Sequence, residues 1–275
     1  MAYRTILVGL DESDGMSSRA AFALALAERL DAKLVGILVN PVPFLPTAMG
    51  EGAAYAGPEI MQAQEEANAA RSKRLEATFR QVTASAQVDC QFVTDEGAPG
   101  EVVARYARVA DLTIVGQSHG QGLGAITMEH AEEIVVGAGG PVLVLPHARP
   151  VSQDFGRNWL VAWDGGKEAA RALAFALPFL RAAERVVVVA AGEEYHASAE
   201  AAVARLAAHG VKAELENLSE PEGLIGELLL TIASTKQATA MVMGAYGHSR
   251  FRELVMGGAT ITIVRDAPIP VLFSA

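Results

Sequence analysis

Cysteine, clusters of basic residues and long apolar runs are all scarce in this sequence. Its single cysteine, Cys90, excludes an internal disulfide and any zinc site built from several cysteines. Lysine and arginine number 22 against 32 aspartates and glutamates, so the net charge is −10, and neither side of Pro150 holds a basic block. A surface that binds duplex nucleic acid by neutralising its phosphates is therefore not expected.

The apolar stretches are also too short for a membrane protein. None approaches the ~20 residues that cross a bilayer, and the first residues lack the basic segment, apolar run and cleavage site of a signal peptide. We therefore expect a cytoplasmic protein with no membrane partner. Hydrophobic residues still make up 51% of the 275 positions and charged residues 20%, which excludes a disordered chain and allows one large or two medium domains.

The chain repeats itself. A short apolar run ends at Asp11 and a similar run ends at Asp164, and each is followed by a loop and an alanine-rich helix. Further on, an apolar run ending at Gly116 matches one ending at Gly244, 128 positions later. The two aspartates are 153 positions apart, so the first half has about 25 extra residues, which we place in the Pro- and Gly-rich stretch 41–58. A duplication explains both matches.

Each half alternates short apolar strands with amphipathic helices. The strands are expected near residues 4–10, 33–39, 87–94, 111–116 and 141–145, and near residues 158–163, 185–190, 211–217, 239–244 and 269–274. Because these runs are rich in Val, Ile and Leu and lack strict alternation, they are typical of parallel strands buried on both faces and connected by helices. We therefore predict an α/β fold of two domains, residues 1–148 and 149–275.

Several glycines follow the strands of the second half. Ligands of open parallel sheets bind beyond the carboxyl ends of the strands, and here those positions carry Asp164-Gly165-Gly166 and then Gly244, Gly247, Gly257 and Gly258. Glycines let the backbone approach a ligand, and helix-start N–H groups favour anions, so the spacing is a candidate phosphate site. The alternative is that these glycines only form a tight turn and relieve helix packing.

Other chemical motifs are missing. Neither G-x-x-x-x-G-K-[ST] nor a G-x-G-x-x-G after the first strand of either half occurs, which argues against a P-loop NTPase and a Rossmann dehydrogenase. His130 and Glu133 have the helical spacing of metal ligands, but a solvated helix face is the simpler interpretation. We predict no catalytic residue and no metal ligand.

The strand that ends Val-Gly-Leu-Asp11 and the pattern Gly244-x2-Gly247-x9-Gly257 resemble the nucleotide signature of the universal stress protein family. The resemblance covers nearly the whole chain, twice, as in a tandem member. It implies two open five-stranded parallel sheets with helices on both faces and strand order 3-2-1-4-5. It also implies that the halves pair through their last strands as an intramolecular pseudo-dimer, and it leaves a homodimer of whole chains open.

The resemblance further implies an adenine nucleotide, ATP or AMP, in the second half, with Mg²⁺ as an optional companion. Asp164 would contact the base or ribose with Trp163 beside it, Ala190 would line the adenine pocket, and the glycine loop would hold the phosphates. The nucleotide-binding residues implied in this way are Ala162, Trp163, Asp164, Ala190, Met243, Gly244, Tyr246, Gly247, Gly257, Gly258, Ala259 and Thr260.

The sequence departs from the family pattern in two places. Gly258 stands where the family usually has Ser or Thr, which removes a hydroxyl ligand, although Thr260 follows two residues later. In the first half, His119, Glu129 and His130 occupy the positions of the last three glycines. A carboxylate repels phosphate and bulky side chains block the backbone, so we expect the nucleotide site of the first half to be degenerate.

The expected function is therefore nucleotide binding in a stress-response or signalling protein, with slow ATP hydrolysis at most. Two alternatives stay open. A nucleotide-free interaction module is favoured by the departure at Gly258. An enzyme that forms or cleaves an adenylate would need a phosphate loop after the first strand, of which Asp164-Gly165-Gly166 is a partial match.

Overall fold

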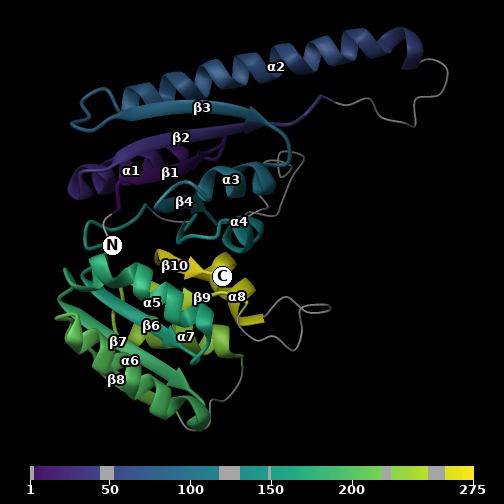
Figure 1. The fold of residues 1–275 in the computed structure, drawn as a ribbon. Coiled ribbons are helices and arrows are strands. Elements are labelled where there is room, and N and C mark those ends of the chain that lie inside the picture. Colours follow the sequence, from purple (N-terminus) through teal and green to yellow (C-terminus); the bar gives the residue numbers. More distant parts are fainter. Residues whose placement is uncertain (1–2, 44–52, 118–130, 148–149, 219–223, 247–257) are drawn as a thin grey trace.

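A computed structural model describes residues 3–43, 53–117, 131–147, 150–218, 224–246 and 258–275 (Figure 1). Ten strands form one sheet in the order β3-β2-β1-β4-β5-β10-β9-β6-β7-β8. The strands of the first half are β1 (Thr5–Leu10), β2 (Lys33–Asn40), β3 (Cys90–Glu96), β4 (Leu112–Gly116) and β5 (Val142–Leu145). Those of the second half are β6 (Asn158–Trp163), β7 (Arg185–Ala191), β8 (Glu214–Leu218), β9 (Ala240–Gly244) and β10 (Val271–Ser274).

The strand order confirms the prediction within each half, because both halves read 3-2-1-4-5 with every pair parallel. The two open sheets expected from the sequence are, however, one continuous sheet. They join where β10 pairs antiparallel with β5, with Leu272 opposite Leu143. Pairing these two apolar strands covers sheet edges that would otherwise be exposed, so the expected contact through the last strands is confirmed.

Helices cover both faces of this sheet, as buried parallel strands require. One face carries α1 (Met16–Leu30), α2 (Ala53–Val82), α5 (Lys167–Leu180) and α6 (His196–Ala208), and the other carries α3 (Pro99–Ala107), α4 (Ala131–Gly137), α7 (Ile225–Thr235) and α8 (Gly258–Asp266). Their apolar faces form two cores, one on each side of the sheet. Phe79 of α2 and Leu206 of α6 belong to the first, and Ile134 of α4 and Ile263 of α8 to the second.

The two halves differ most in α2. It has 30 residues, whereas its counterpart α6 has 13, and in Figure 1 it extends beyond the end of β3. Much of the extra length that the sequence places around residues 41–58 therefore lies in a longer helix, and residues 44–52 lie outside the described part of the chain. Leu75 and Phe79, in the second half of α2, hold it against the sheet.

Side chains join the halves on both faces of the sheet. On the α1/α5 face, Phe155 lies in the segment between β5 and β6. Its ring packs edge-on against Phe22 at 4.9 Å and against Trp159 at 5.7 Å, measured between ring centroids. On the α4/α8 face, Arg265 lies 3.4 Å from the buried carboxylate of Glu132. These contacts and the shared sheet fit the expected internal pseudo-dimer. Within the described residues, no helix is long and apolar enough to cross a bilayer.

Candidate functional site in the second half

The register of the sheet brings the predicted site residues of the second half to one edge. β6 lies between β7 and β9, with Trp163 opposite Ala190 and Ala162 opposite Met243. The chain reaches β7 on one side of β6 and β9 on the other, so this is the point where the strand order reverses. Open α/β sheets bind their ligands at such a point, beyond the carboxyl ends of the strands. Ala190 is completely buried there, so its contact with a base stays a prediction.

The loop after β6 presents Asp164 at this edge. Oδ1 of Asp164 accepts a hydrogen bond from the backbone N–H of Gly166 at 2.9 Å, which closes a tight turn before α5. Gly165 has a φ of +71°, a conformation that side chains rarely adopt, so glycine is needed at this position. The turn holds the half-buried Asp164 carboxylate in a fixed place.

On the side of β7, aromatic and acidic residues lie beside the loop that carries Asp164. Nε1–H of Trp163 donates to Oγ of Ser198 at 3.0 Å, and that hydroxyl donates to the Tyr195 carbonyl at 2.8 Å. The Tyr195 ring lies over Gly165. Burial, and then the charges of Glu194 and Asp164, raise the pKa of Tyr195. Sequence reasoning missed Tyr195 and Ser198, because nothing in the turn between β7 and α6 marks them as lying beside Asp164.

Helix packing requires a glycine at position 244, the last residue of β9. A Cβ at this position would lie 2.8 Å from the carbonyl carbon of Glu168 and 2.9 Å from Cα of Ala169, and close to the backbone nitrogen of Ala169 as well. The first turn of α5 therefore rests directly on β9. This contact accounts for Gly244 without a ligand, which is the packing alternative raised from the sequence.

The start of α8 has the opposite character. Gly258, its first residue, is exposed, and a Cβ there would meet nothing within 4 Å. Ala259 is half-buried and the Thr260 side chain is buried. A helix start carries unpaired backbone N–H groups that favour anions, and packing does not explain the glycine. Gly247 and Gly257, also predicted to hold phosphates, lie outside the described residues.

Tyr246 follows β9 in an unusual conformation. Its φ is +60°, and its buried hydroxyl has no hydrogen-bond partner within the described residues. Burial, and then the charge of Glu132, raise its pKa to about 12, while Arg265 lowers it. The ring packs on the α4/α8 core. Tyr246 therefore anchors the chain after β9 in the contact between the halves, and a role in touching nucleotide stays a prediction.

Comparison with known proteins settles the family. The sequence model of the universal stress protein family matches residues 2–146 and matches again at residues 157–274. The chain belongs to the universal stress protein family. Among curated proteins, no sequence matches it significantly.

Solved structures of the family share the fold. A universal stress protein of Archaeoglobus fulgidus has a TM-score of 0.69 at 16% identity, over 98% of this chain and 97% of its own. A universal-stress-type protein of Pseudomonas aeruginosa has a TM-score of 0.56 at 17% identity, over 99% and 93%. An Arabidopsis thaliana family protein with AMP bound covers 55% of this chain and 97% of its own, at 17% identity and a TM-score of 0.38.

In the first half, side chains of the protein itself fill the matching region at the carboxyl ends of the strands. Arg19 of α1 pairs with Asp11 at 2.6 Å, and both side chains are more than nine-tenths buried. Nε–H of Arg19 also donates to the Gly9 carbonyl at 2.9 Å. At the constant offset of 153 positions, the counterpart of Arg19 in the second half is Ala172. A buried arginine therefore neutralises the aspartate of the first strand in the first half, whereas the uncharged Ala172 stands at the matching position of α5 in the second.

A second arginine fills the end of β2. Arg71 of α2 donates to the Val39 carbonyl at 3.0 Å and to Oδ1 of Asn40 at 2.9 Å, and it pairs with Glu12 at 3.1 Å. The Arg71–Glu12 pair bridges the carboxyl ends of β1 and β2. These contacts are compatible with a degenerate nucleotide site in the first half, which stays a prediction. The degeneracy was predicted from His119, Glu129 and His130, and these three residues lie outside the described part of the chain.

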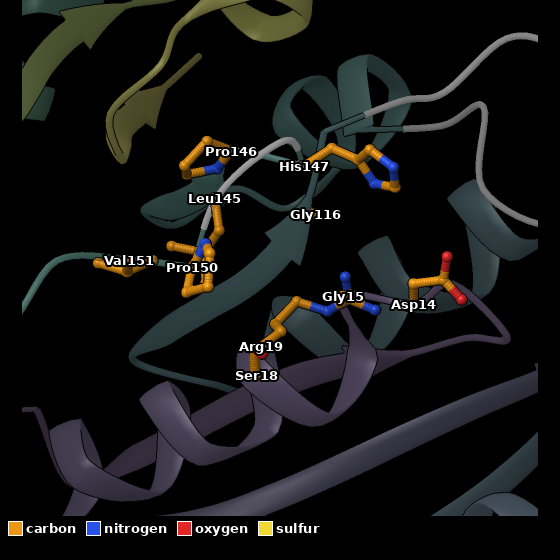
Figure 2. A pocket seen from close by; sticks show the side chains of 10 residues that line it. All are labelled: Asp14, Gly15, Ser18, Arg19, Gly116, Leu145, Pro146, His147, Pro150 and Val151. Atoms are coloured by element: carbon orange, nitrogen blue, oxygen red, sulfur yellow. The ribbon is translucent and has the colours of Figure 1, made fainter.

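A small pocket lies beside Arg19 at the ends of β4 and β5 (Figure 2). Its volume is about 180 Å³, below the roughly 300 Å³ at which pockets for small organic ligands begin. It is lined by Asp14, Gly15, Ser18, Arg19, Gly116, Leu145, Pro146, His147, Pro150 and Val151. Asp11 already balances the charge of Arg19, so this pocket offers a nucleotide neither the room nor the free positive charge that it needs.

Proposed function

We propose that the second half of this universal stress protein binds one adenine nucleotide, ATP or AMP, and that the protein acts through this ligand in stress response or signalling. One observation carries the proposal: among the described residues, no buried arginine lies at the carboxyl ends of β6, β7 and β9, whereas Arg19 and Arg71 fill the matching ends of β1, β2 and β4. We take the two halves as domains of residues 1–148 and 149–275, of which the second carries the site.

Electrostatics supports one orientation for the nucleotide. Asp164 and the nearby Glu194 repel phosphate, and the half-buried Trp163 offers an aromatic surface, so the base and ribose belong at the ends of β6 and β7. The phosphates belong at the start of α8, where Gly258 leaves the backbone open. Gly247 and Gly257 remain the predicted companions of Gly258.

Mg²⁺ would reach this site with the nucleotide. Within the described part of the chain, no three His, Cys, Asp or Glu side chains gather to hold a metal ion. Mg²⁺ commonly binds substrate phosphates and water with few protein ligands, so the residues present are compatible with an ion held mainly by ATP. We assign no catalytic residue.

Calorimetric titration and native mass spectrometry test the proposal together. We expect one AMP or ATP per chain, and we expect Asp164→Asn to weaken binding while Asp11→Ser, in a chain that still folds, leaves it unchanged. Two equivalent sites would contradict the assignment to the second half. A folded chain that binds neither AMP nor ATP at millimolar concentration would instead favour the nucleotide-free interaction module.

A further inference from the structure

Glu168 is an unusual feature of the second half. This residue of the first turn of α5 is only 5% exposed, and its Oε2 has no hydrogen-bond partner among the described residues. Among the described residues, Oε1 accepts a long hydrogen bond from Nη2 of Arg171 at 3.4 Å and lies 3.6 Å from Nζ of Lys167, and both of these side chains are exposed or half-exposed. A buried carboxylate oxygen without a donor is destabilising, so its presence calls for an explanation.

The fold does not require a carboxylate at this position. At the offset of 153 residues, the counterpart of Glu168 in the first half is Gly15, where α1 begins without any side chain. The helix α5 could therefore start equally well without a buried acid. Within the described part of the chain, neither a hydrogen bond nor a close ion pair accounts for Oε2 of Glu168, and a bound ligand could supply the missing donor.

Gly166 creates a cradle between Glu168 and Asp164. A Cβ at this position would lie 3.0 Å from Oδ1 of Asp164 and 3.5 Å from Oε2 of Glu168. Two carboxylate oxygens from separate residues thus border the same small space. The backbone of Gly166, with φ −73° and ψ 161°, suits any residue, so its conformation does not demand glycine. No side chain of residue 166 therefore stands between the two oxygens.

We propose that Asp164 and Glu168 accept hydrogen bonds from the two ribose hydroxyls of the nucleotide across Gly166, so that the site selects ribonucleotides over deoxyribonucleotides. This inference rests on the proposed function. Ionised carboxylates only accept hydrogen bonds, and a vicinal diol supplies two neighbouring donors. Acidic side chains at the end of a strand hold ribose hydroxyls in other nucleotide-binding α/β folds. The two negative charges also direct the phosphates away, toward α8.

Titration with three ligands tests the inference. AMP, 2′-deoxy-AMP and 3′-deoxy-AMP are titrated in metal-free buffer into the wild-type chain, Glu168→Met and Gly166→Ala. We expect the wild type to bind AMP about tenfold or more tightly than either deoxynucleotide, because hydrogen bonds to charged groups are the stronger class. In Glu168→Met, the affinity ratio for one of the two deoxynucleotides should fall toward one, because only one hydroxyl loses its acceptor, and the other ratio should persist through Asp164. In Gly166→Ala, whose methyl group fills the cradle, both ratios should fall. Glu193→Gln is the matched control, because it changes an exposed acid in the turn between β7 and α6, and both affinity ratios should stay as in the wild type.

Thermal unfolding of the ligand-free chain separates this role from a structural one. Glu168→Met replaces an unsatisfied buried carboxylate by an apolar side chain of similar size, so the melting temperature should rise while discrimination against one of the two deoxynucleotides is lost. A lower melting temperature with unchanged selectivity would assign Glu168 to structure and overturn the inference. So would AMP binding without discrimination in the wild type. A rise in melting temperature with Mg²⁺ alone that Glu168→Met abolishes would mark a cation site instead. Absence of any AMP binding would refute the proposed function, and this inference with it.

Discussion

Two glycines of the nucleotide signature should respond in opposite ways to the same substitution. Gly244 and Gly258 look alike in the sequence, but their surroundings differ. A Cβ on Gly244 would meet backbone atoms of α5 at 2.8 and 2.9 Å, whereas one on Gly258 would meet nothing within 4 Å. Backbone atoms cannot rotate away as a flexible side chain can, so Gly244→Ala forces α5 to move from β9.

The size of each effect follows from these distances. Overpacking of this kind costs about 1–3 kcal/mol, and we expect Gly244→Ala to fall in the upper part of that range because three backbone atoms are involved. At roughly 2–4 °C per kcal/mol for a chain of this size, the melting temperature should drop by about 5–10 °C. Gly258→Ala places alanine in a helix without strain and should raise stability by up to about 1 kcal/mol.

Tryptophan fluorescence in a urea titration measures the difference in stability between the two variants, and it does so in the second half of the protein. Both tryptophans, Trp159 and Trp163, lie in β6, so the signal reports on the second half. AMP titration of the same variants gives the second readout. Gly258→Ala should weaken AMP binding without loss of stability, whereas Gly244→Ala should lose stability first. If Gly244→Ala were as stable as the wild type, the close approach of α5 to β9 would be refuted.

Three further outcomes test other parts of the structure. Asp11→Asn leaves the buried Arg19 without its partner and should destabilise the first half by about 3–5 kcal/mol, measured by urea unfolding followed by circular dichroism. Phe155→Ala removes the ring that packs against both halves and should cost about 3 kcal/mol; an unchanged melting temperature would contradict this packing. Burial and Glu132 raise the pKa of Tyr246 to about 12, so the folded chain keeps the phenol proton longer than the unfolded chain does. Stability should therefore fall as the pH rises from 10 through 12, and the urea midpoint of Tyr246→Phe should fall less over that range.

The sequence was sufficient for the succession of strands and helices because the signals for it are local and repeated, whereas the order of the strands in the sheet came from the family resemblance. Short runs of Val, Ile and Leu alternate with helices at two constant offsets, and these runs predict parallel strands whatever the partner residues are. The ends of most strands agree with the prediction to within two or three residues. The pairing of β5 with β10 could also be predicted, because both runs are apolar and would be exposed sheet edges in a single half.

The details of the site could not be read in the same way, because they depend on contacts between distant elements. Arg71 reaches Glu12 across 59 positions, and no local pattern indicates that a charged residue of a long helix turns inward. Glu168 resembles an ordinary acidic residue in the first turn of a helix, where it would favour the helix dipole from solvent. Only the packing of α5 on Gly244 shows that it is buried. The role of Gly244 in that packing likewise depends on a helix 75 positions away.

The antiparallel junction between the halves keeps the proposed site of the second half apart from the matching region of the first. Strands within each half are parallel, and β5 runs antiparallel to β10. The carboxyl ends of the strands of the first half therefore lie on the opposite side of the sheet from those of the second half. A ligand at the end of β6 therefore does not share residues with the ends of β1 and β2. Arg19 and Arg71 could enter the first site as buried partners of Asp11 and Glu12 without disturbing the second. Both halves share the same backbone fold, and among the described residues buried arginines lie at the carboxyl ends of the strands in the first half alone, which is the difference on which the proposed assignment of the site rests.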